Sequence, residues 1–178
     1  MIEIMLDLEF MGKPPHAAIS AIGAAMVIDN VVTSCFYQRV DLRDSVRMGG
    51  TLDADTIIWW LGQPDAARAE MCRPGESLGA ALGLFTRWVK GQSSGLNVSA
   101  VWGYGATADL AIIRHAYDCA LIPTPWDFRA DSCFRTETTQ YVRRTGKQVP
   151  WVECGIPHHA GDDAVSQAMT LIEMRKAD

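Results

Sequence analysis

The sequence predicts an α/β domain in which helices flank a mixed β-sheet. Two observations carry this prediction. Three strand-like runs open the chain, at residues 1–8, 17–28 and 31–40. After them, segments with apolar residues at helical spacing alternate with a further strand-like run at 98–102. Strands that come first and then alternate with helices are typical of such a layered architecture.

The three opening strands are separated by clear breaks. In residues 1–8, apolar side chains alternate with polar ones, as expected for a buried strand. Gly12-Lys13-Pro14-Pro15 ends this run, and residues 17–28 are apolar again. Asp29-Asn30 predicts a tight turn. The β-branched and aromatic residues of 31–40 are therefore expected to return as a hairpin.

Helical signals follow the hairpin. The clearest comes from Leu78, Leu82, Phe85 and Val89, which recur at the spacing of one helix face. Asp53 or Thr51 is expected to cap an earlier helix, since short polar side chains are preferred at that position. The expected helices, in chain order, are 53–61, one beginning at Pro64, 76–90, 110–120, 131–144 and 161–176.

Two more strands are expected within the helical part of the chain. Residues 98–102 are apolar and stop at Gly103. A short fifth strand is expected at Trp126-Asp127-Phe128, after a loop that contains Pro123 and Pro125.

The size and composition favour one globular domain, expected to span residues 1–178. The net charge of −5 argues against a protein that binds long polyanions through a broad positive field. Five scattered cysteines without a CxxC or CxxH pair argue against zinc and favour a reducing cytoplasm. No signal peptide or membrane span is expected, because acidic residues interrupt the N-terminus and no apolar run approaches ~20 residues.

A pair of carboxylates marks the end of the first strand. Asp7 and Glu9 lie two residues apart, so they point to the same face, while Leu8 points into the core. Two adjacent carboxylates on an apolar strand are costly unless a cation lies between them. Oxygen ligands alone favour Mg²⁺ or Mn²⁺. A solvated strand end is the alternative, and it is favoured when the pair is considered by itself.

Two further segments carry candidate ligands. Asp109 follows the fourth strand and opens a helix, where its charge also suits the helix N-terminus without any catalytic role. His158 lies five residues before Asp163 at the entry to the last helix. A loop histidine followed by capping aspartates is the structural alternative for this segment.

Together these segments read Asp-x-Glu on the first strand, Asp after the fourth, and His-x4-Asp entering the last helix. This pattern resembles the DEDD 3′–5′ exonuclease superfamily, in the DEDDh branch that includes proofreading exonucleases, ribonuclease T and oligoribonuclease. Residues 19–24 and 103–109 add local similarity. Ile58-Trp59-Trp60-Leu61 resembles a small bacterial and phage subgroup, described as exoribonucleases or as exodeoxyribonuclease VIII-like.

The resemblance implies a ribonuclease H-like fold with a five-stranded mixed sheet, in which the acidic segments converge at one end. It also implies two divalent metal ions, Mg²⁺ or Mn²⁺. Asp7, Glu9 and Asp163 would hold the first ion, and Asp7 would bridge to a second that Asp109 completes. Ions placed in this way activate water and offset charge on the phosphate.

The resemblance also implies roles in proton transfer and substrate binding. His158 is the expected general base. His159 paired with Asp162 is the alternative register, although the His-x4-Asp spacing selects His158. Phe10 and Met11 are expected to pack on the terminal base and to bind the 3′-hydroxyl through the backbone, with ordinary core packing as an equal alternative.

Other candidates for substrate contact are weaker. Arg129 and Arg135 stay open as phosphate-binding residues, whereas Arg143 and Arg144 are expected on a solvated helix face. Trp59 and Trp60 could stack on bases. Because neighbouring residues on a helix cannot face the same way, at least one of these two rings is expected in the core or in an interface.

The expected activity is the release of nucleoside monophosphates from the 3′ end of single-stranded or overhanging nucleic acid, with RNA slightly favoured over DNA. Two alternatives remain: a catalytically silent nucleic-acid-binding domain of the same fold, and an oligoribonuclease-like hydrolase of very short oligonucleotides. Relatives often form dimers, so a homodimer is one expected assembly, with the helix of Trp59 and Trp60 as a candidate surface.

Overall fold

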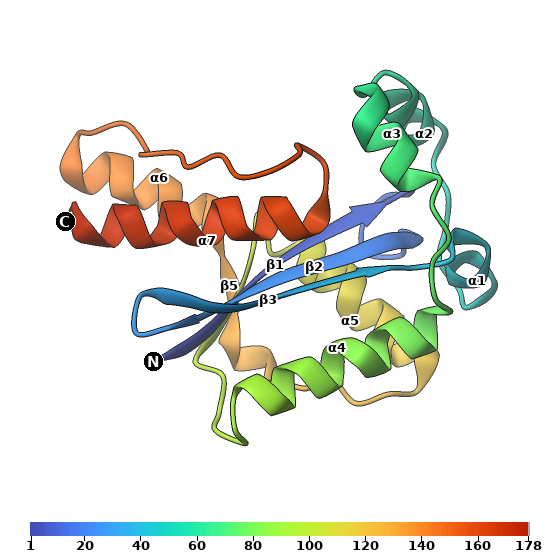
Figure 1. The fold of residues 1–178 in the computed structure, drawn as a ribbon, viewed down its shortest axis with the longest axis horizontal. Coiled ribbons are helices and arrows are strands. Elements are labelled where there is room, and N and C mark those ends of the chain that lie inside the picture. Colours follow the sequence, from blue (N-terminus) through green and yellow to red (C-terminus); the bar gives the residue numbers. More distant parts are fainter. Residues whose placement is uncertain (178) are drawn as a thin grey trace.

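The computed structural model describes residues 1–177, so Asp178, which the predicted domain includes, lies outside the described residues. Its centre is a five-stranded mixed sheet with the order β3-β2-β1-β4-β5 (Figure 1). The first three strands pair antiparallel, and β4 and β5 continue the sheet in parallel with β1. This sheet confirms the predicted fold class. The strands are β1 Ile2–Phe10, β2 Ile19–Ile28, β3 Val31–Arg39, β4 Ala100–Gly103 and β5 Asp131–Cys133.

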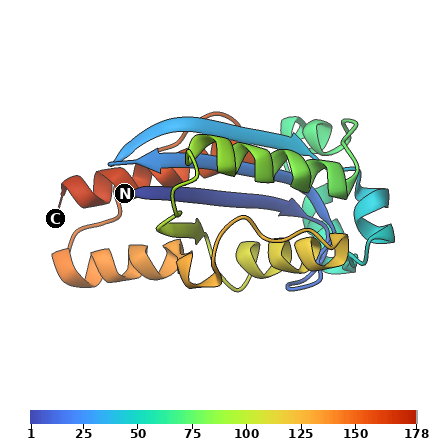
Figure 2. The same ribbon diagram turned by 90° about the horizontal axis from the view of Figure 1, so that it is seen from below.

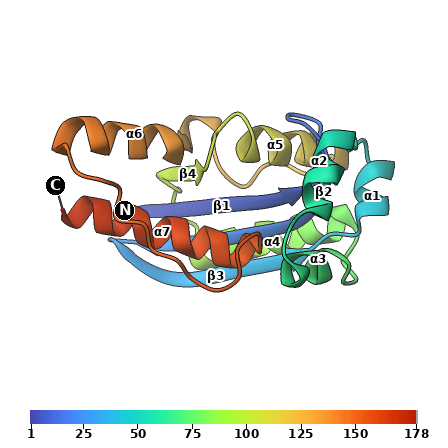
Figure 3. The ribbon, with the colours of Figure 1, turned by 90° about the horizontal axis from the view of Figure 1, so that it is seen from above.

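Helices cover both faces of the sheet. Viewed from below, α4 and α5 lie over one face, and viewed from above, α6 and α7 lie over the other (Figures 2 and 3). Among the described residues, no helix is long and apolar enough to cross a membrane. The helices are α1 Leu42–Arg47, α2 Ala54–Leu61, α3 Asp65–Met71, α4 Leu78–Gln92, α5 Asp109–Ala120, α6 Phe134–Thr145 and α7 Ala160–Lys176.

The central strand β1 divides the core in two. Ile4, Leu6 and Leu8 are buried in the cluster that includes α4 and α5. Met5 is buried in the opposite cluster, with α6 and α7. Since successive side chains on a strand alternate between faces, the odd-numbered residues of β1 turn toward α7. β1 extends to Phe10, two residues further than expected, so Asp7 is inside a paired strand and not at its frayed end.

The fifth strand lies at a different place from the predicted one. Residues 126–128 do not form a strand, because the Asp127 side chain caps a 3₁₀ turn at Phe128–Ala130 by accepting a hydrogen bond from the Arg129 backbone N–H at 2.9 Å. Phe128 is 62% exposed, so this apolar side chain is not part of a buried strand. The real β5 is three residues long and polar, and it pairs with β4 in the stretch where a helix was expected to begin.

A short hairpin of helices stands over the C-terminal end of β1. α2 and α3 form this hairpin, and α1, which the sequence pattern did not reveal, is only six residues long (Figure 1). The Trp60 indole N–H donates a hydrogen bond to the Phe10 carbonyl oxygen at 3.1 Å, and the Tyr37 hydroxyl donates to Glu70 at 2.7 Å. These two bonds tie the hairpin to β1 and β3.

Candidate active site

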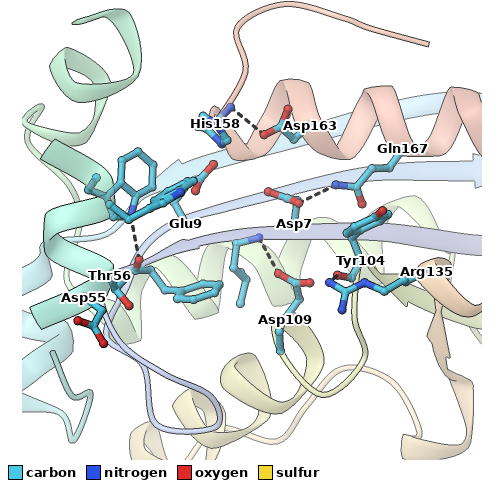
Figure 4. Close-up of a pocket in the computed structure, with 15 residues that line it drawn as sticks. Asp7, Glu9, Asp55, Thr56, Tyr104, Asp109, Arg135, His158, Asp163 and Gln167 are labelled. Carbon is cyan, nitrogen blue, oxygen red and sulfur yellow. Dashed lines mark hydrogen bonds between the residues drawn. The ribbon is translucent and has the colours of Figure 1, made fainter. Parts of the chain in front are cut away.

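Three carboxylates from distant parts of the sequence meet on the α7 side of the sheet. Asp7 and Glu9 come from β1 and Asp163 from the first turn of α7, and each offers an oxygen atom within 4.8 Å of the others. Figure 4 shows Asp7 and Asp163 on facing elements with Glu9 further along β1. The alternation of β1 places both of its carboxylates on this face.

Gly23 allows α7 to approach the sheet at this point. It is the register partner of Asp7 on β2. A Cβ atom at Gly23 would lie 2.0 Å from the carbonyl carbon and oxygen of Ala160, so only a glycine fits there. The first turn of α7 therefore rests directly on β2, and this contact brings Asp163 to the level of Asp7.

A fourth carboxylate, Asp109, approaches from the opposite side of β1. It begins α5 and is buried, and it accepts a hydrogen bond from the Leu8 backbone N–H at 3.3 Å. Pairing between β4 and β1 ends at Leu6, which leaves the Leu8 N–H free for this contact. Figure 4 shows the Asp109 side chain below Asp7, in the same cleft.

Burial raises the pKa values of all four carboxyl groups, and repulsion from the neighbouring carboxylates adds to the shifts of Asp7 and Glu9. Burial is the main cause of the Asp7 shift, which is large, and the charges of Asp109, Glu9 and Asp163 add to it. Burial, followed by the charges of Asp163 and Asp109, raises the pKa of Glu9 to about 8. Burial raises the pKa of Asp109 to about 6 and that of Asp163 above its usual value. Buried carboxyl groups with raised pKa values favour a bound cation, because the cation stabilises their charged forms.

The donor set fits a hard divalent ion. Glu9 Oε1 is buried and has no hydrogen-bond partner among the described residues. A buried carboxylate oxygen without a partner is costly, and a metal ion would supply the missing interaction. The ligand atoms of the cluster are all oxygens, which is the chemistry that Mg²⁺ and Mn²⁺ prefer.

Gln167, which the sequence reasoning missed, holds Asp7 in place. Its amide Nε2 donates a hydrogen bond to Asp7 Oδ1 at 2.7 Å and lowers the pKa of Asp7 against the stronger effect of burial. Gln167 lies four residues after Asp163 on α7 and therefore on the same helix face. This spacing was the one signal in the sequence that could have identified it.

An extended segment, residues 151–158, runs along α7 (Figure 1). It ends at His158, which lies at the site (Figure 4). We call this segment the strap. His158 ends it with φ +62° and a backbone N–H that donates to Asp163 Oδ2 at 2.9 Å. The imidazole ring lies edge-to-face with Trp59 of α2, with ring centroids 5.0 Å apart.

The two neighbouring histidines have different environments. His158 lines the cleft, whereas His159 caps α7 by accepting a hydrogen bond at Nδ1 from the Asp162 backbone N–H at 3.2 Å. The His159 ring packs on Tyr37 with centroids 4.0 Å apart. The geometry therefore supports the register of His158 with Asp163 over that of His159 with Asp162.

These groups share one cleft of about 590 Å³. All of the predicted site residues line it except Met11, whose side chain packs in a small cluster with Trp60 and Ala67. Trp60 is 5% exposed and Trp59 is 49% exposed, so one of the two rings lies in the core, as expected. The cleft residues are Asp7, Leu8, Glu9, Phe10, Asp55, Thr56, Trp59, Trp60, Tyr104, Ala108, Asp109, Arg135, His158, Asp163 and Gln167.

Of the two arginines left open, the structure places only Arg135 on the cleft. Its guanidinium group lies over the Tyr104 ring, 5.0 Å from the centroid, and donates to the Tyr104 carbonyl oxygen at 3.0 Å. Its positive charge lowers the pKa of Asp109. Arg129 does not line the cleft and pairs with Asp127 on the surface.

Comparison with protein families identifies the chain. The family model described as the 3′–5′ exoribonuclease Rv2179c-like domain matches residues 2–174. The chain belongs to the Rv2179c-like 3′–5′ exoribonuclease family. Membership in the Rv2179c-like family makes the protein a hydrolytic 3′–5′ exonuclease of a class that depends on divalent metal ions. Comparison with the curated proteins finds no matching sequence.

Solved structures of several nucleases share the fold of this Rv2179c-like domain. The nuclease domain of 3′hExo, a DEDDh family member bound to rAMP, matches with a TM-score of 0.60 at 13% identity, over 99% of this chain and 92% of that chain. Cell-death related nuclease 4 matches with a TM-score of 0.64 at 15% identity, over 99% and 64%. E. coli Exonuclease I, in complex with a dT13 oligonucleotide, matches with a TM-score of 0.59 at 16% identity, over 99% and 40%.

The chain spans less than two thirds of the length of cell-death related nuclease 4 and of Exonuclease I. At these identities the likeness shows a shared fold. Together with the family match, it confirms the resemblance to the DEDD exonucleases that the sequence motifs indicated.

Proposed function

We propose that the protein releases nucleoside monophosphates one at a time from the 3′ end of single-stranded or overhanging nucleic acid, using two divalent metal ions. One observation carries the proposal. Asp7, Glu9 and Asp163 offer oxygens within 4.8 Å of one another, and they lie in a cleft that also contains Asp109 and His158. Carboxylates gathered in this way can hold the two ions of a two-ion phosphodiester hydrolysis, and a histidine beside them can act as a general base.

The carboxylates divide between the two proposed ion sites. Asp7, Glu9 and Asp163 would hold one ion, and Asp7 with Asp109 would hold the other. When bound, the ions supply Lewis acidity, which lowers the pKa of a coordinated water and offsets negative charge on the phosphate. Gln167 fixes the orientation of Asp7, the residue that belongs to both sets.

His158 is the proposed general base. A ring nitrogen of neutral imidazole can accept the proton of the attacking water, because histidine titrates near neutral pH. The strap and the backbone hydrogen bond to Asp163 support this assignment, since they hold the ring at the mouth of the cleft.

The terminal nucleotide is proposed to bind between α2 and the end of β1. Phe10, Thr56 and the exposed ring of Trp59 line this end of the cleft. An aromatic ring offers a stacking surface for any base. Met11 is proposed to contribute through its backbone only, because its side chain is buried elsewhere.

RNA is the preferred substrate in this proposal, with DNA as a second substrate. The family description names an exoribonuclease, and the 3′hExo domain was crystallised with rAMP. Exonuclease I, in complex with a dT13 oligonucleotide, supports testing DNA as well.

The test is a degradation assay with Mn²⁺, Mg²⁺ or EDTA. RNA and DNA strands, single-stranded and with overhangs, carry a label at either the 5′ or the 3′ end. A 3′-labelled strand is expected to release labelled mononucleotide at once, and a 5′-labelled strand to shorten stepwise. Asp7→Asn and Asp163→Asn should abolish release. Asp118→Asn, which removes an exposed carboxylate outside the cleft, is the matched control and should retain it.

Other outcomes of the same assay identify the alternatives. Binding of the strand without release by the wild-type protein would indicate a catalytically silent domain. Release from dinucleotides but not from longer strands would indicate an oligoribonuclease-like enzyme. A homodimer is proposed separately, because Ile58 and Leu61 expose apolar side chains on α2, and light scattering of the purified protein tests it.

A further inference from the structure

The strap is fixed to α7 by a regular series of hydrogen bonds. Alternate backbone N–H groups of the strap donate to side-chain oxygens that recur every fourth residue on α7. The pairs are Val152 with Thr170 at 3.0 Å, Cys154 with Ser166 at 3.0 Å and Ile156 with Asp162 at 2.8 Å.

The two repeats match in length. Two residues of extended chain span about 6.6 Å and four residues of α-helix rise about 6 Å, so the series continues without strain over three bonds. Gly155 allows the last bond to form. Its φ is +65°, and a Cβ atom there would lie 2.2 Å from the Asp162 carboxylate. The strap is therefore a fixed wall beside α7.

Trp151 begins this wall and presents an open aromatic face. Its ring lies 6.0 Å from Tyr104 and 6.1 Å from Phe134, between ring centroids. Phe134 is fully buried, so it anchors the cluster, whereas Trp151 is 52% exposed. The ring is thus held in position from one side and left free for a ligand on the other.

A second cavity of about 380 Å³ lies between Trp151 and α7, next to the catalytic cleft. Tyr104, Asp163 and Gln167 line both, so the two spaces adjoin beside the carboxylates. The opposite end of the cleft is closed by α2, where Trp60 is hydrogen-bonded to the Phe10 carbonyl oxygen. An enzyme that acts on a chain end needs one closed side for that end and one open side for the rest of the strand.

We infer that this second cavity is a subsite for the nucleotide on the 5′ side of the scissile phosphate, with its base stacked on Trp151. The inference rests on the proposed exonuclease function and sets the direction of the strand. The 3′-terminal nucleotide lies against α2, and the strand leaves over Tyr104 toward the strap. Arg135, which lies over Tyr104 at the boundary of the two spaces, meets the backbone phosphate.

The charges around the second cavity indicate how it would bind a nucleotide. No lysine or arginine is among its described lining residues, which include the acidic Glu153. Inside this cavity, binding therefore depends on base stacking, and the phosphate contact with Arg135 lies at its boundary. Stacking on an aromatic ring accepts any base, because every base has a π face. The subsite should then be indifferent to sequence and little affected by salt.

The test compares a substrate that has no second nucleotide with one that has it, with Mn²⁺ present throughout. In the p-nitrophenyl ester of uridine 5′-monophosphate, p-nitrophenol replaces the second nucleoside as the leaving group, whereas a uridine tetranucleotide fills the second subsite with a nucleotide. Trp151→Ala should raise KM for the tetranucleotide by about 5- to 150-fold relative to its effect on the ester, the range expected for loss of one base stack. Trp151→Phe should restore most of the difference, and the ratio should be similar at low and high salt.

Two matched variants complete the test. Phe128→Ala removes an exposed aromatic ring outside both cavities and should change neither KM. Trp59→Ala removes the ring at the closed end and should weaken both substrates. Equal effects of Trp151→Ala on the two substrates, or no effect on either, would overturn the subsite while leaving the exonuclease function in place. Failure of the wild-type protein to cleave either substrate would overturn the proposed function itself.

Discussion

Gly23 of β2 lies against the carbonyl group of Ala160, without room for a single additional carbon atom between them. Gly23 is also the register partner of Asp7. One contact between backbones therefore sets the distance between the carboxylates of the central strand and Asp163 at the start of α7.

Gly23→Ala should separate α7 from the sheet. The added methyl group must displace backbone, so we expect unfolding to become easier by about 1–3 kcal/mol or more. Mn²⁺ binding should weaken with it, because Asp163 moves away from Asp7. Thermal unfolding and calorimetric Mn²⁺ titration measure the two effects. Gly79→Ala on α4 is the control: a Cβ there meets nothing within 4 Å, so stability should stay the same or rise. Equal behaviour of the two variants would contradict this account.

The metal-free protein should lose stability as the pH rises. The pKa of Glu9 is about 8 in the folded protein, above its ordinary value, so the folded state holds the proton more tightly than the unfolded state. This contribution to stability is fully present below about pH 4.5 and is lost as the pH rises through 8. The free energy of unfolding in EDTA should therefore fall by an amount on the order of a few kcal/mol between pH 5 and pH 9, and the melting temperature should fall with it. Added Mn²⁺ should reverse this loss of stability. In EDTA, Glu9→Gln should make the melting temperature depend less on pH. A pH dependence as steep as that of the wild type would contradict the role given to Glu9.

Substitution of the two adjacent histidines should separate catalysis from helix capping. His158→Ala should reduce kcat by about 10²- to 10⁴-fold with Mn²⁺ binding retained, because it removes the proposed base. His159→Ala should retain most of the activity and lower stability by about 1 kcal/mol, since His159 caps α7. Steady-state kinetics and thermal unfolding on both variants make the comparison. A larger loss of kcat in His159→Ala would shift the assignment to that residue.

Gln167→Leu should move metal binding to higher pH. Its amide hydrogen bond lowers the pKa of Asp7, so removing the bond lets that pKa rise further. Asp7 must be ionised to bind a cation, so the midpoint pH of Mn²⁺ binding should increase. The control is Gln140→Leu, which alters an exposed amide on α6 outside the cleft. An unchanged midpoint in Gln167→Leu would show that the amide does not tune Asp7.

Patterns within a single element predicted much of this architecture. The alternation along β1 predicts Asp7 and Glu9 on one face and Leu8 in the core, and the structure has this arrangement. The turn at Asp29-Asn30 connects β2 and β3 as expected. These features depend on neighbours in the sequence, which is where the periodicity of side chains carries information.

Features that depend on contacts between distant segments were not predicted. β5 is three polar residues that form a strand only because β4 lies beside them. The position of Met11 in a separate small cluster follows from the packing of Trp60 against the end of β1. The contact of Gly23 with Ala160 joins residues that no local pattern connects. In each case a tertiary neighbour decides the outcome.

The pairing of the strap with α7 implies a parity rule for this part of the chain. Inserting one residue between Val152 and Ile156 would turn the following N–H groups away from the helix and would also rotate His158 out of the cleft. Inserting two residues would restore the orientation of the N–H groups, and the extra length would bulge out of the strap as a small loop. Variation in the length of this segment should therefore be tolerated in even steps and rejected in odd ones.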